Sequence, residues 1–384
     1  MASTPLFAFE ISAQHIRTFS AAVTALSAVG KEICLGVSRA RSGDQAYLTL
    51  SAYDDAATSF GSFRFEERFF TRAQTRRSGY GAGDFACKIL ARTLFPALKR
   101  ATARCHAGGN TGGKARAGSG VLKLVIRHDE PRDDDDDGGD GDDDEDAEAI
   151  TRAFPRLTLE LFHDDGSRRR WRLFYEGAEA QTVAFDTEAA EVGEIVAQPP
   201  QLSSILGHAE GREMSFAVAV GELRVSSTAD DAEANDGELA TELKISSTDF
   251  ESYLLPEDRG GGDDAASIAF QIKQAKAMVR FCDSADVGEI KFYFSAPGRP
   301  VALLARAANG CDCRFIISST RVRRAASPPP NASRAPSNAS TNRSLPEAVH
   351  GKRKHPCERP PATLSQTQDG PQASRPRRDS SDAF

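Results

Sequence analysis

The sequence has no long apolar run and no recognisable metal or redox motif. No stretch of its 384 residues is apolar enough to cross a bilayer, and the N-terminus lacks the basic and apolar regions of a secretory signal. The seven cysteines include no CxxC pair and no repeated metal-ligand spacing. We therefore expect reduced, structural thiols in a nuclear or cytosolic protein with no membrane contact, no metal and no cofactor.

The motifs of the common catalytic sites are also missing. The sequence has no P-loop, no GxSxG and no HExxH. Its richest source of carboxylates is the Asp-rich run at 132–148, which has no rigid scaffold to hold metal ligands at fixed positions. We expect no catalytic residues and no enzymatic activity, and a nuclease built on these carboxylates is the least favoured alternative.

Two segments are too polar to form a core. Residues 133–148 hold twelve Asp or Glu and no Lys or Arg, and such a run of like charges predicts a solvated loop. Residues 323–384 are rich in Pro, Ser, Asn and Arg and poor in aliphatic side chains, so they cannot bury enough apolar surface to offset the entropy of ordering. The sequence therefore predicts a disordered tail at 323–384.

The remaining chain presents one order of elements twice. Hydrophobic periodicity predicts a strand and an early helix within residues 6–28, and again a strand at Thr182–Asp186 and a short helix near Pro200. Each half then continues with short antiparallel strands and a later helix. We therefore expect an α+β fold made of two tandem domains of one type, residues 1–178 and 179–322.

The later helix of each half, predicted at Phe85–Lys99 and Lys273–Ser284, has a basic face. Cations recur at helical spacing opposite apolar side chains, without acids among them. Over seven residues a helix rises about 10 Å, so such cations can meet successive phosphates of DNA without reading bases. An ordinary solvated face, which usually mixes both signs, is the alternative. The candidate DNA contacts are Lys88, Arg92, Lys99, Arg104, Lys273, Lys276 and Arg280.

The tail contains short motifs typical of regulated nuclear proteins. Ser365 and Thr367 each precede a glutamine, the pattern favoured by DNA-damage checkpoint kinases, while the acid-flanked pair Ser380 and Ser381 suits an acidophilic kinase. Phosphorylation would add about two negative charges at each site and create a ligand for a basic pocket. The basic cluster Lys352, Arg353 and Lys354 resembles a nuclear import signal, with simple solubilisation as the alternative.

Three motifs in the folded part resemble a known family. The aromatic strand and turn Phe292–Pro300, the run Phe60–Phe65 leading into Phe69–Phe70, and Cys87–Leu90 are similar to the Rad-nine subunit of the nine-one-one checkpoint clamp. The likeness extends over roughly residues 6–320 in the order of elements.

This resemblance implies a sliding-clamp fold like that of proliferating cell nuclear antigen, with helices inside a ring and antiparallel sheets outside. It further implies a nuclear heterotrimer with Rad-one-type and Hus-one-type subunits that encircles double-stranded DNA without sequence specificity. An ATP-dependent clamp loader and a BRCT-repeat scaffold that binds the phosphorylated tail are the other implied partners. The Asp-rich run and Ser295, where an acid is expected, depart from the family pattern.

Two further functional hypotheses stay open. An acidic nuclear adaptor or histone-binding chaperone would use the Asp-rich run to bind basic partners. A replicative homotrimer of the same fold is the nearest rival within the clamp class, although processivity alone does not require the Ser-Gln tail.

Overall fold

The computed structural model describes residues 5–39, 45–76, 85–105, 120–128, 156–209, 211–228, 240–256 and 266–321, all within one compact unit, Met1–Ala325. Several predicted features lie outside these residues: the acidic loop at 132–148, the tail at 323–384, and with it the phosphorylation and import sites Ser365, Thr367, Ser380, Ser381, Lys352, Arg353 and Lys354.

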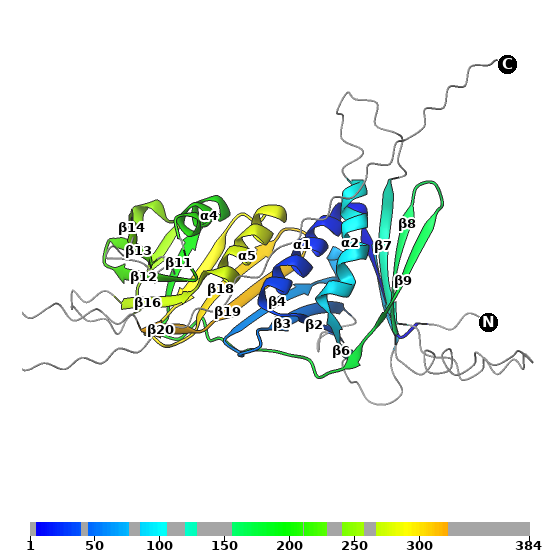
Figure 1. Ribbon diagram of the computed structural model, residues 1–384, viewed down its shortest axis with the longest axis horizontal. Coiled ribbons are helices and arrows are strands. Elements are labelled where there is room, and N and C mark those ends of the chain that lie inside the picture. The colour runs from blue at the N-terminus through cyan, green and yellow to red at the C-terminus, as the bar shows by residue number, and fades with distance from the viewer. Residues whose placement is uncertain are drawn as a thin grey trace, which may run out of the picture. The chain divides into compact units, whose positions relative to one another are not determined.

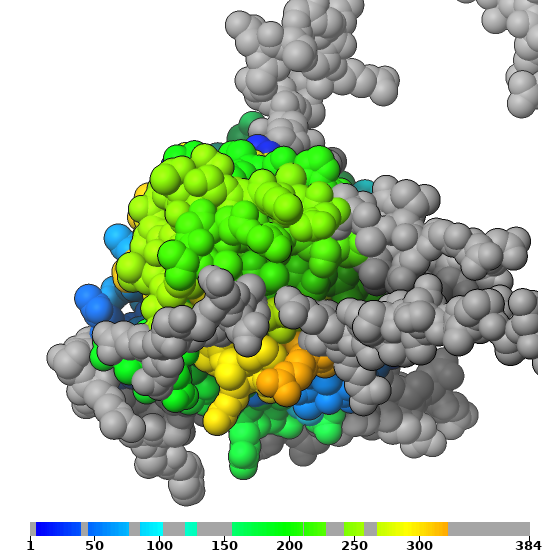
Figure 2. Space-filling view, turned by 90° about the vertical axis from the view of Figure 1, so that its left-hand side faces the viewer, coloured from blue at the N-terminus to red at the C-terminus, as the bar shows by residue number. Residues whose placement is uncertain are grey.

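Three antiparallel sheets form the framework, and we call them A, B and C. Sheet A has the order β5 (Arg72–Thr75), β1 (Phe7–Ser12), β7 (Val121–His128), β8 (Arg156–His163) and β9 (Arg168–Phe174). Sheet C has the order β14 (Ala240–Ser246), β13 (Glu222–Thr228), β12 (Glu213–Ala219), β16 (Ala266–Gln271) and β20 (Ser319–Arg321). Figure 2 looks onto the second half, where sheet C and α4 make up most of the green to yellow-green surface.

Sheet B joins the two halves. Its first five strands come from the first half of the chain: β10 (Glu176–Gly177), β6 (Phe85–Leu90), β2 (Glu32–Arg39), β3 (Ala46–Tyr53) and β4 (Ser59–Phe65). The other five come from the second half: β19 (Cys311–Ile317), β18 (Val301–Ala307), β17 (Ile290–Phe294), β11 (Gly193–Ala197) and β15 (Ser252–Leu254). Strands β4 and β19 pair from Phe65 opposite Cys311 to Ser59 opposite Ile317, so one hydrogen-bonded sheet crosses the junction.

Four α-helices lie in a single row. They are α1 (Ala13–Val29), α2 (Ala91–Cys105), α4 (Pro199–Gly207) and α5 (Ile272–Ser284), and two 3₁₀ turns lie at Glu67–Phe69 and Ser247–Asp249. Helices α1 and α5 lie over sheet B, and α2 lies against sheet A and strand β6. Helix α1 contacts α2 on one side and α5 on the other, and α5 contacts α4, as Figure 1 shows. The expected α+β class with antiparallel sheets and helices on one side is confirmed.

The core beneath this row is dense at the junction of the halves. Phe63 of β4 lies with its ring centroid 4.4 Å from that of Phe281 on α5. Helix α1 crosses β4 at Gly61, where a Cβ atom would lie 3.1 Å from Leu26 and 3.2 Å from Val29. Glycine therefore lets the helix approach the strand closely, and the helix row is held firmly to the sheet.

The connection between the halves differs from the prediction. Thr182–Asp186 forms no strand, and the first strand of the second half is β11. Val183 and Phe185 pack instead on the outer face of sheet B, the face away from the helices, against a cluster centred on Phe60 and Ile316. Their alternation arises because every second side chain of an extended segment meets the sheet surface, with no strand pairing.

The later helix of the first half begins and ends six residues later than predicted, at Ala91 and Cys105. Phe85–Leu90 is strand β6, and helix α2 begins only at Ala91. Strand β6 pairs with β2, which contributes Ile33 and Leu35 to the same core as Cys87 and Ile89. This pairing with a distant strand overrides the local helical spacing. The predicted later helix of the second half is confirmed as α5.

Candidate nucleic-acid interface

The helix row carries almost only positive charge. Asp283 near the end of α5 is the single acid in the four α-helices. The same helices contain eight cations: Arg17, Arg92, Lys99, Arg100, Arg104, Lys273, Lys276 and Arg280. Because one side of each helix is buried against the rest of the fold, the exposed polar side chains lie on the opposite side, where they form one basic surface. We call this surface the helix face.

Helix α5 positions the cations of the second half. Its buried side, which includes Met278 and Phe281, packs on the core, so Lys273 and Arg280 are exposed about 10 Å apart along the helix. Lys276 is half-buried, and its Nζ donates a hydrogen bond to the Ala209 carbonyl oxygen at 3.2 Å. Lys273 and Arg280 are thus available to a ligand, while Lys276 also ties α5 to the end of α4.

Helix α2 does the same in the first half. Leu94, Leu98 and neighbouring alanines are buried, whereas Arg92 and Lys99 are exposed, as predicted. Arg100, which was not among the predicted DNA contacts, is exposed beside Lys99. Arg104, predicted to follow the helix, belongs instead to its last turn.

Helix α1 links the two basic helices and was missed as part of the site. It contacts both α2 and α5, and it contributes the exposed cation Arg17 but no acid. The sequence held a usable signal, since Ala13–Val29 contains no Asp or Glu although one side of the helix faces solvent. An ordinary solvated helix would mix both signs there.

Lys88 does not belong to the helix face, which corrects the prediction. It lies in β6, where Cys87 and Ile89 point into the core, and strand alternation therefore places Lys88 on the outer face of sheet B. Its Nζ lies 3.9 Å from a carboxylate oxygen of Glu32. The i, i+4 spacing to Arg92 reflects no shared surface, because a strand ends and a helix begins between the two residues.

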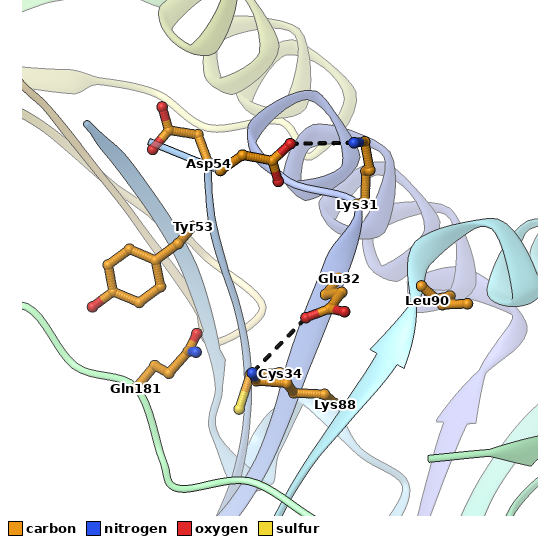
Figure 3. Close-up of a pocket in the computed structure, with 9 residues that line it drawn as sticks. Lys31, Glu32, Cys34, Tyr53, Asp54, Lys88, Leu90 and Gln181 are labelled. Atoms are coloured by element: carbon orange, nitrogen blue, oxygen red, sulfur yellow. Dashed lines mark hydrogen bonds and ion pairs between the residues drawn. The ribbon is translucent and has the colours of Figure 1, made fainter. Parts of the chain in front are cut away.

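The outer face of sheet B mixes charges of both signs and pairs them. Lys88 lines a pocket of about 330 Å³ together with Lys31, Glu32, Cys34, Tyr53, Asp54, Asp55, Leu90 and Gln181 (Figure 3). Within it Lys31 contacts Asp55 at 3.2 Å. Elsewhere on this face Arg306 contacts Glu66 at 2.8 Å. This balance contrasts with the helix face, where cations have almost no acidic neighbours.

The thiol and the phenol of this pocket are not activated as nucleophiles. Burial raises the pKa of the Cys34 thiol, and hydrogen bonding and Lys88 only partly oppose this. Burial also raises the pKa of the Tyr53 hydroxyl. Both groups are therefore neutral near pH 7, and a neutral thiol is a poor nucleophile. Among the described residues no group of three or more His, Cys, Asp or Glu could hold a metal ion, and no helix is long and apolar enough to span a membrane.

Comparison with known proteins identifies the fold. The protein resembles the proliferating cell nuclear antigen of Entamoeba histolytica, with 11% identity, a TM-score of 0.51, and coverage of 83% of this chain and 100% of that chain. It also resembles that of Thermococcus kodakaraensis, with 15% identity, a TM-score of 0.51, and coverage of 82% and 99%. A PCNA2–PCNA3 complex from Sulfolobus tokodaii matches with 14% identity, a TM-score of 0.51, and coverage of 81% and 98%. The expected sliding-clamp fold is thus confirmed.

The family follows from the sequence itself. No curated protein matches the chain. The model of the Rad9 family, however, matches residues 19–320, a span that includes α1, α2, α4 and α5 almost entirely and the whole junction between β4 and β19. Because this match covers well over half of the chain, the protein belongs to the Rad9 family.

Proposed function

We propose that this protein is a non-catalytic subunit of a heterotrimeric DNA sliding clamp that acts in the DNA-damage checkpoint in the nucleus. Family and fold support a clamp-type checkpoint subunit. The observation that carries the proposal is the contrast between the helix face, with one acid, and the mixed outer face of sheet B. In a closed ring the helix face lines the bore, where its cations meet duplex phosphates without selecting a sequence.

Two open sheet edges support assembly with other subunits. Among the described strands, β9 ends sheet A and β14 ends sheet C, each with only one neighbour. An edge strand has unpaired N–H and C=O groups that can pair with another chain. The β9 sequence contains four arginines, whereas β14 contains one Glu and one Lys. A homotrimer would pair a cationic strand with a neutral one, and distinct neighbours of the Rad-one and Hus-one types can offer a better charge match.

The remaining parts of the proposal concern organisation and recruitment. Residues 1–178 and 179–322 form the two clamp domains, and an ATP-dependent loader places the ring on DNA. Residues 323–384 form a tail with an import signal at 352–354. Phosphorylation of Ser365, Thr367, Ser380 or Ser381 in that tail would create ligands for a BRCT-repeat scaffold and so recruit signalling and repair proteins.

Retention on closed circular DNA tests the channel assignment. The complex that co-purifies with the full-length chain is loaded onto circular DNA and challenged with rising salt. The inner variant R92Q/K99Q/K273Q/R280Q removes four exposed cations of the helix face. The outer variant K31Q/R64Q/K88Q/K291Q removes four cations from the opposite side of sheet B and is its matched control.

We expect the inner variant to load less and to dissociate at lower salt, because fewer phosphates are neutralised. The outer variant should behave like the unmodified complex. Equal losses in both variants, or no loss in the inner one, would show that the helix face does not line the DNA channel.

The composition of the purified complex tests the assembly. Two other clamp-like proteins in equal amounts support the heterotrimer, whereas a self-trimer would indicate a processivity clamp. A monomer bound to histones would favour the acidic adaptor. Deletion of residues 133–148 separates the two hypotheses: an adaptor would lose histone binding, whereas a clamp would still assemble.

A further inference from the structure

A second basic surface lies on sheet A, on the side away from the core. Leu157, Leu159 and Leu161 of β8 point into the core, so the alternate residues of this strand and their cross-strand partners share the opposite side. We call this side the arginine face. It carries seven cations, Arg72, Lys123, Arg127, Arg156, Arg168, Arg170 and Arg172, against two acids, Glu10 and Glu160. Its formal net charge is therefore +5.

One buried carboxylate organises the centre of this face. Glu160 is 2% exposed, and one of its oxygens lies 3.3 Å from Arg127, 2.9 Å from Arg168 and 2.5 Å from Arg170. Nearby, Lys123 contacts Glu10 at 2.8 Å. A single carboxylate shared by three guanidinium groups holds them close together, and the cluster keeps an excess of positive charge that attracts further anions.

Arg156 lies at one end of the face. It begins β8 and stacks over the ring of Phe174 at 5.2 Å. Its Nε and Nη2 atoms are buried and have no hydrogen-bond partner in the described part of the chain. Buried charged donors are normally paired, so these two atoms mark a position that suits an acidic group. Arg172 is exposed and likewise has no ion-pair partner among the described residues.

The chain itself supplies an anion of the right size beside this face. The twelve acids of residues 133–148 lie between β7, which ends at His128, and β8, which begins at Arg156. These two strands pair within sheet A, with His128 opposite Leu157. The five residues from His128 to Asp133 can extend about 17 Å, and a five-stranded sheet is about 19 Å wide. The acids can therefore reach cations on every strand of the face.

We propose that the acidic segment 133–148 docks on the arginine face and masks it from other polyanions. Attachment at both ends gives the segment a high effective concentration, so an external polyanion must displace it to bind. Nucleic acid is thereby kept off this side of sheet A, and the helix face remains the open basic surface. This role goes beyond the proposed clamp function, and it holds for the chain whether or not that function is correct.

Zero-length carbodiimide cross-linking tests the docking directly. The reagent joins a lysine amine to a carboxylate in contact with it, and Lys123 is the one lysine of the arginine face. In the full-length chain we expect Lys123 to form amides with acids of residues 133–148 in mass spectra of the monomeric product. The Lys123–Glu10 contact at 2.8 Å is the internal positive control. Lys31 and Lys273, on other surfaces, are the negative controls.

Two perturbations decide the outcome. In 1 M salt the Debye length falls to about 3 Å, and we expect the Lys123 amides to the segment to fall about fivefold while the Glu10 amide persists. The variant R156Q/R168Q/R172Q leaves Arg127 and Arg170 on Glu160 and should give a similar loss. Equal cross-linking of the segment to Lys123, Lys31 and Lys273, or yields that neither perturbation changes, would overturn the proposal.

Heparin binding tests the masking. In the R92Q/K99Q/K273Q/R280Q background, which weakens the contribution of the helix face, deletion of residues 133–148 should shift elution from heparin to higher salt. Adding R156Q/R168Q/R172Q should reverse this shift. A deletion that leaves the elution unchanged would show that the segment does not mask the face, and the face would then be open to an external polyanion.

Discussion

Replacing Phe63 with alanine tests whether the two halves of the folded unit are one cooperative structure. Phe63 is fully buried on β4, at the strand that pairs with β19 across the junction. Its ring lies 4.4 Å from that of Phe281 and 5.9 Å from that of Phe315, both in the second half. The substitution therefore removes contacts between the halves while leaving every backbone hydrogen bond of the β4–β19 pair intact.

The expected cost follows from the packing. Truncation of a buried Phe to Ala costs about 3–5 kcal/mol in a protein core. A value of about 4 kcal/mol is expected here, since the site is closed by a helix and two paired strands that cannot collapse into the cavity. For a domain of this size class each kcal/mol lowers the midpoint of thermal unfolding by about 2–4 °C, so the loss should be about 8–16 °C.

Two probes report on the transition. Trp171 is the single tryptophan and lies on β9 of sheet A, in the first half, whereas far-UV circular dichroism reports on all sheets. In urea unfolding of the full-length chain, both signals should shift together to lower denaturant. Phe174→Ala is the size-matched control, because Phe174 is 56% exposed and its loss should cost less than about 1 kcal/mol.

The result that would refute this reasoning is a Trp171 transition that does not move in the Phe63→Ala variant while the dichroism splits into two phases. The first half would then unfold independently, and the continuous sheet B would not couple the halves.

Three further predictions concern single side chains. Burial raises the pKa of the Cys87 and Cys282 thiols to about 12 from an ordinary value of 9.0. Between pH 9 and 12 these thiols lose their protons in the unfolded state only, so the free energy of unfolding should fall by about 1.4 kcal/mol per pH unit for each thiol. Below pH 9 both states keep the proton, and the stability is unaffected. In urea unfolding, the free energy of unfolding should fall less between pH 8.5 and 10.5 in the C87A/C282A variant than in the unmodified protein. Gly61→Ala should cost about 1–3 kcal/mol in thermal unfolding, because its Cβ would crowd helix α1. Glu160→Gln should cost about 2–4 kcal/mol, since three half-exposed arginines lose their shared counter-ion. Glu242→Gln, at an exposed side chain, should change the unfolding free energy by less than about 0.5 kcal/mol.

Helix α5 could be predicted from its own periodicity, whereas strands β6 and β11 could not be predicted from the sequence alone. Helix α5 was predicted within one residue of its start because its apolar residues recur at helical spacing. The segment Phe85–Leu90 is compatible with both periods: Cys87 and Ile89 alternate with Lys88, while Lys88 and Arg92 have helical spacing. Only pairing with β2, some fifty residues earlier, decides for a strand. The sequence contains both the strand pattern and the helical pattern, and only the tertiary contacts determine which structure forms.

The connector between the halves illustrates the same limit. Val183 and Phe185 are two residues apart, the spacing of side chains on one face of a strand. In the structure they pack with Phe60 and Tyr293 on the outer face of sheet B. The apolar residues are therefore spaced to contact the surface of a sheet, and the segment does not pair as one of its strands. Strand β11 in turn was missed because Gly193–Ala197 is short and nearly all buried, which leaves no alternation to detect.

The charge of the helix face results more from a lack of acids than from an excess of bases. The sequence has 55 Asp and Glu among 384 residues, so the four helices would contain about eight acids if these were spread evenly. They contain one, whereas their eight cations are close to an even share. Solubility requires no such depletion, since mixed charges solvate a surface equally well. A surface that faces a polyanion does require it, because each acid would repel phosphates as strongly as a cation attracts them. The acids that the helices lack are concentrated instead in residues 133–148, beside the arginine face of sheet A.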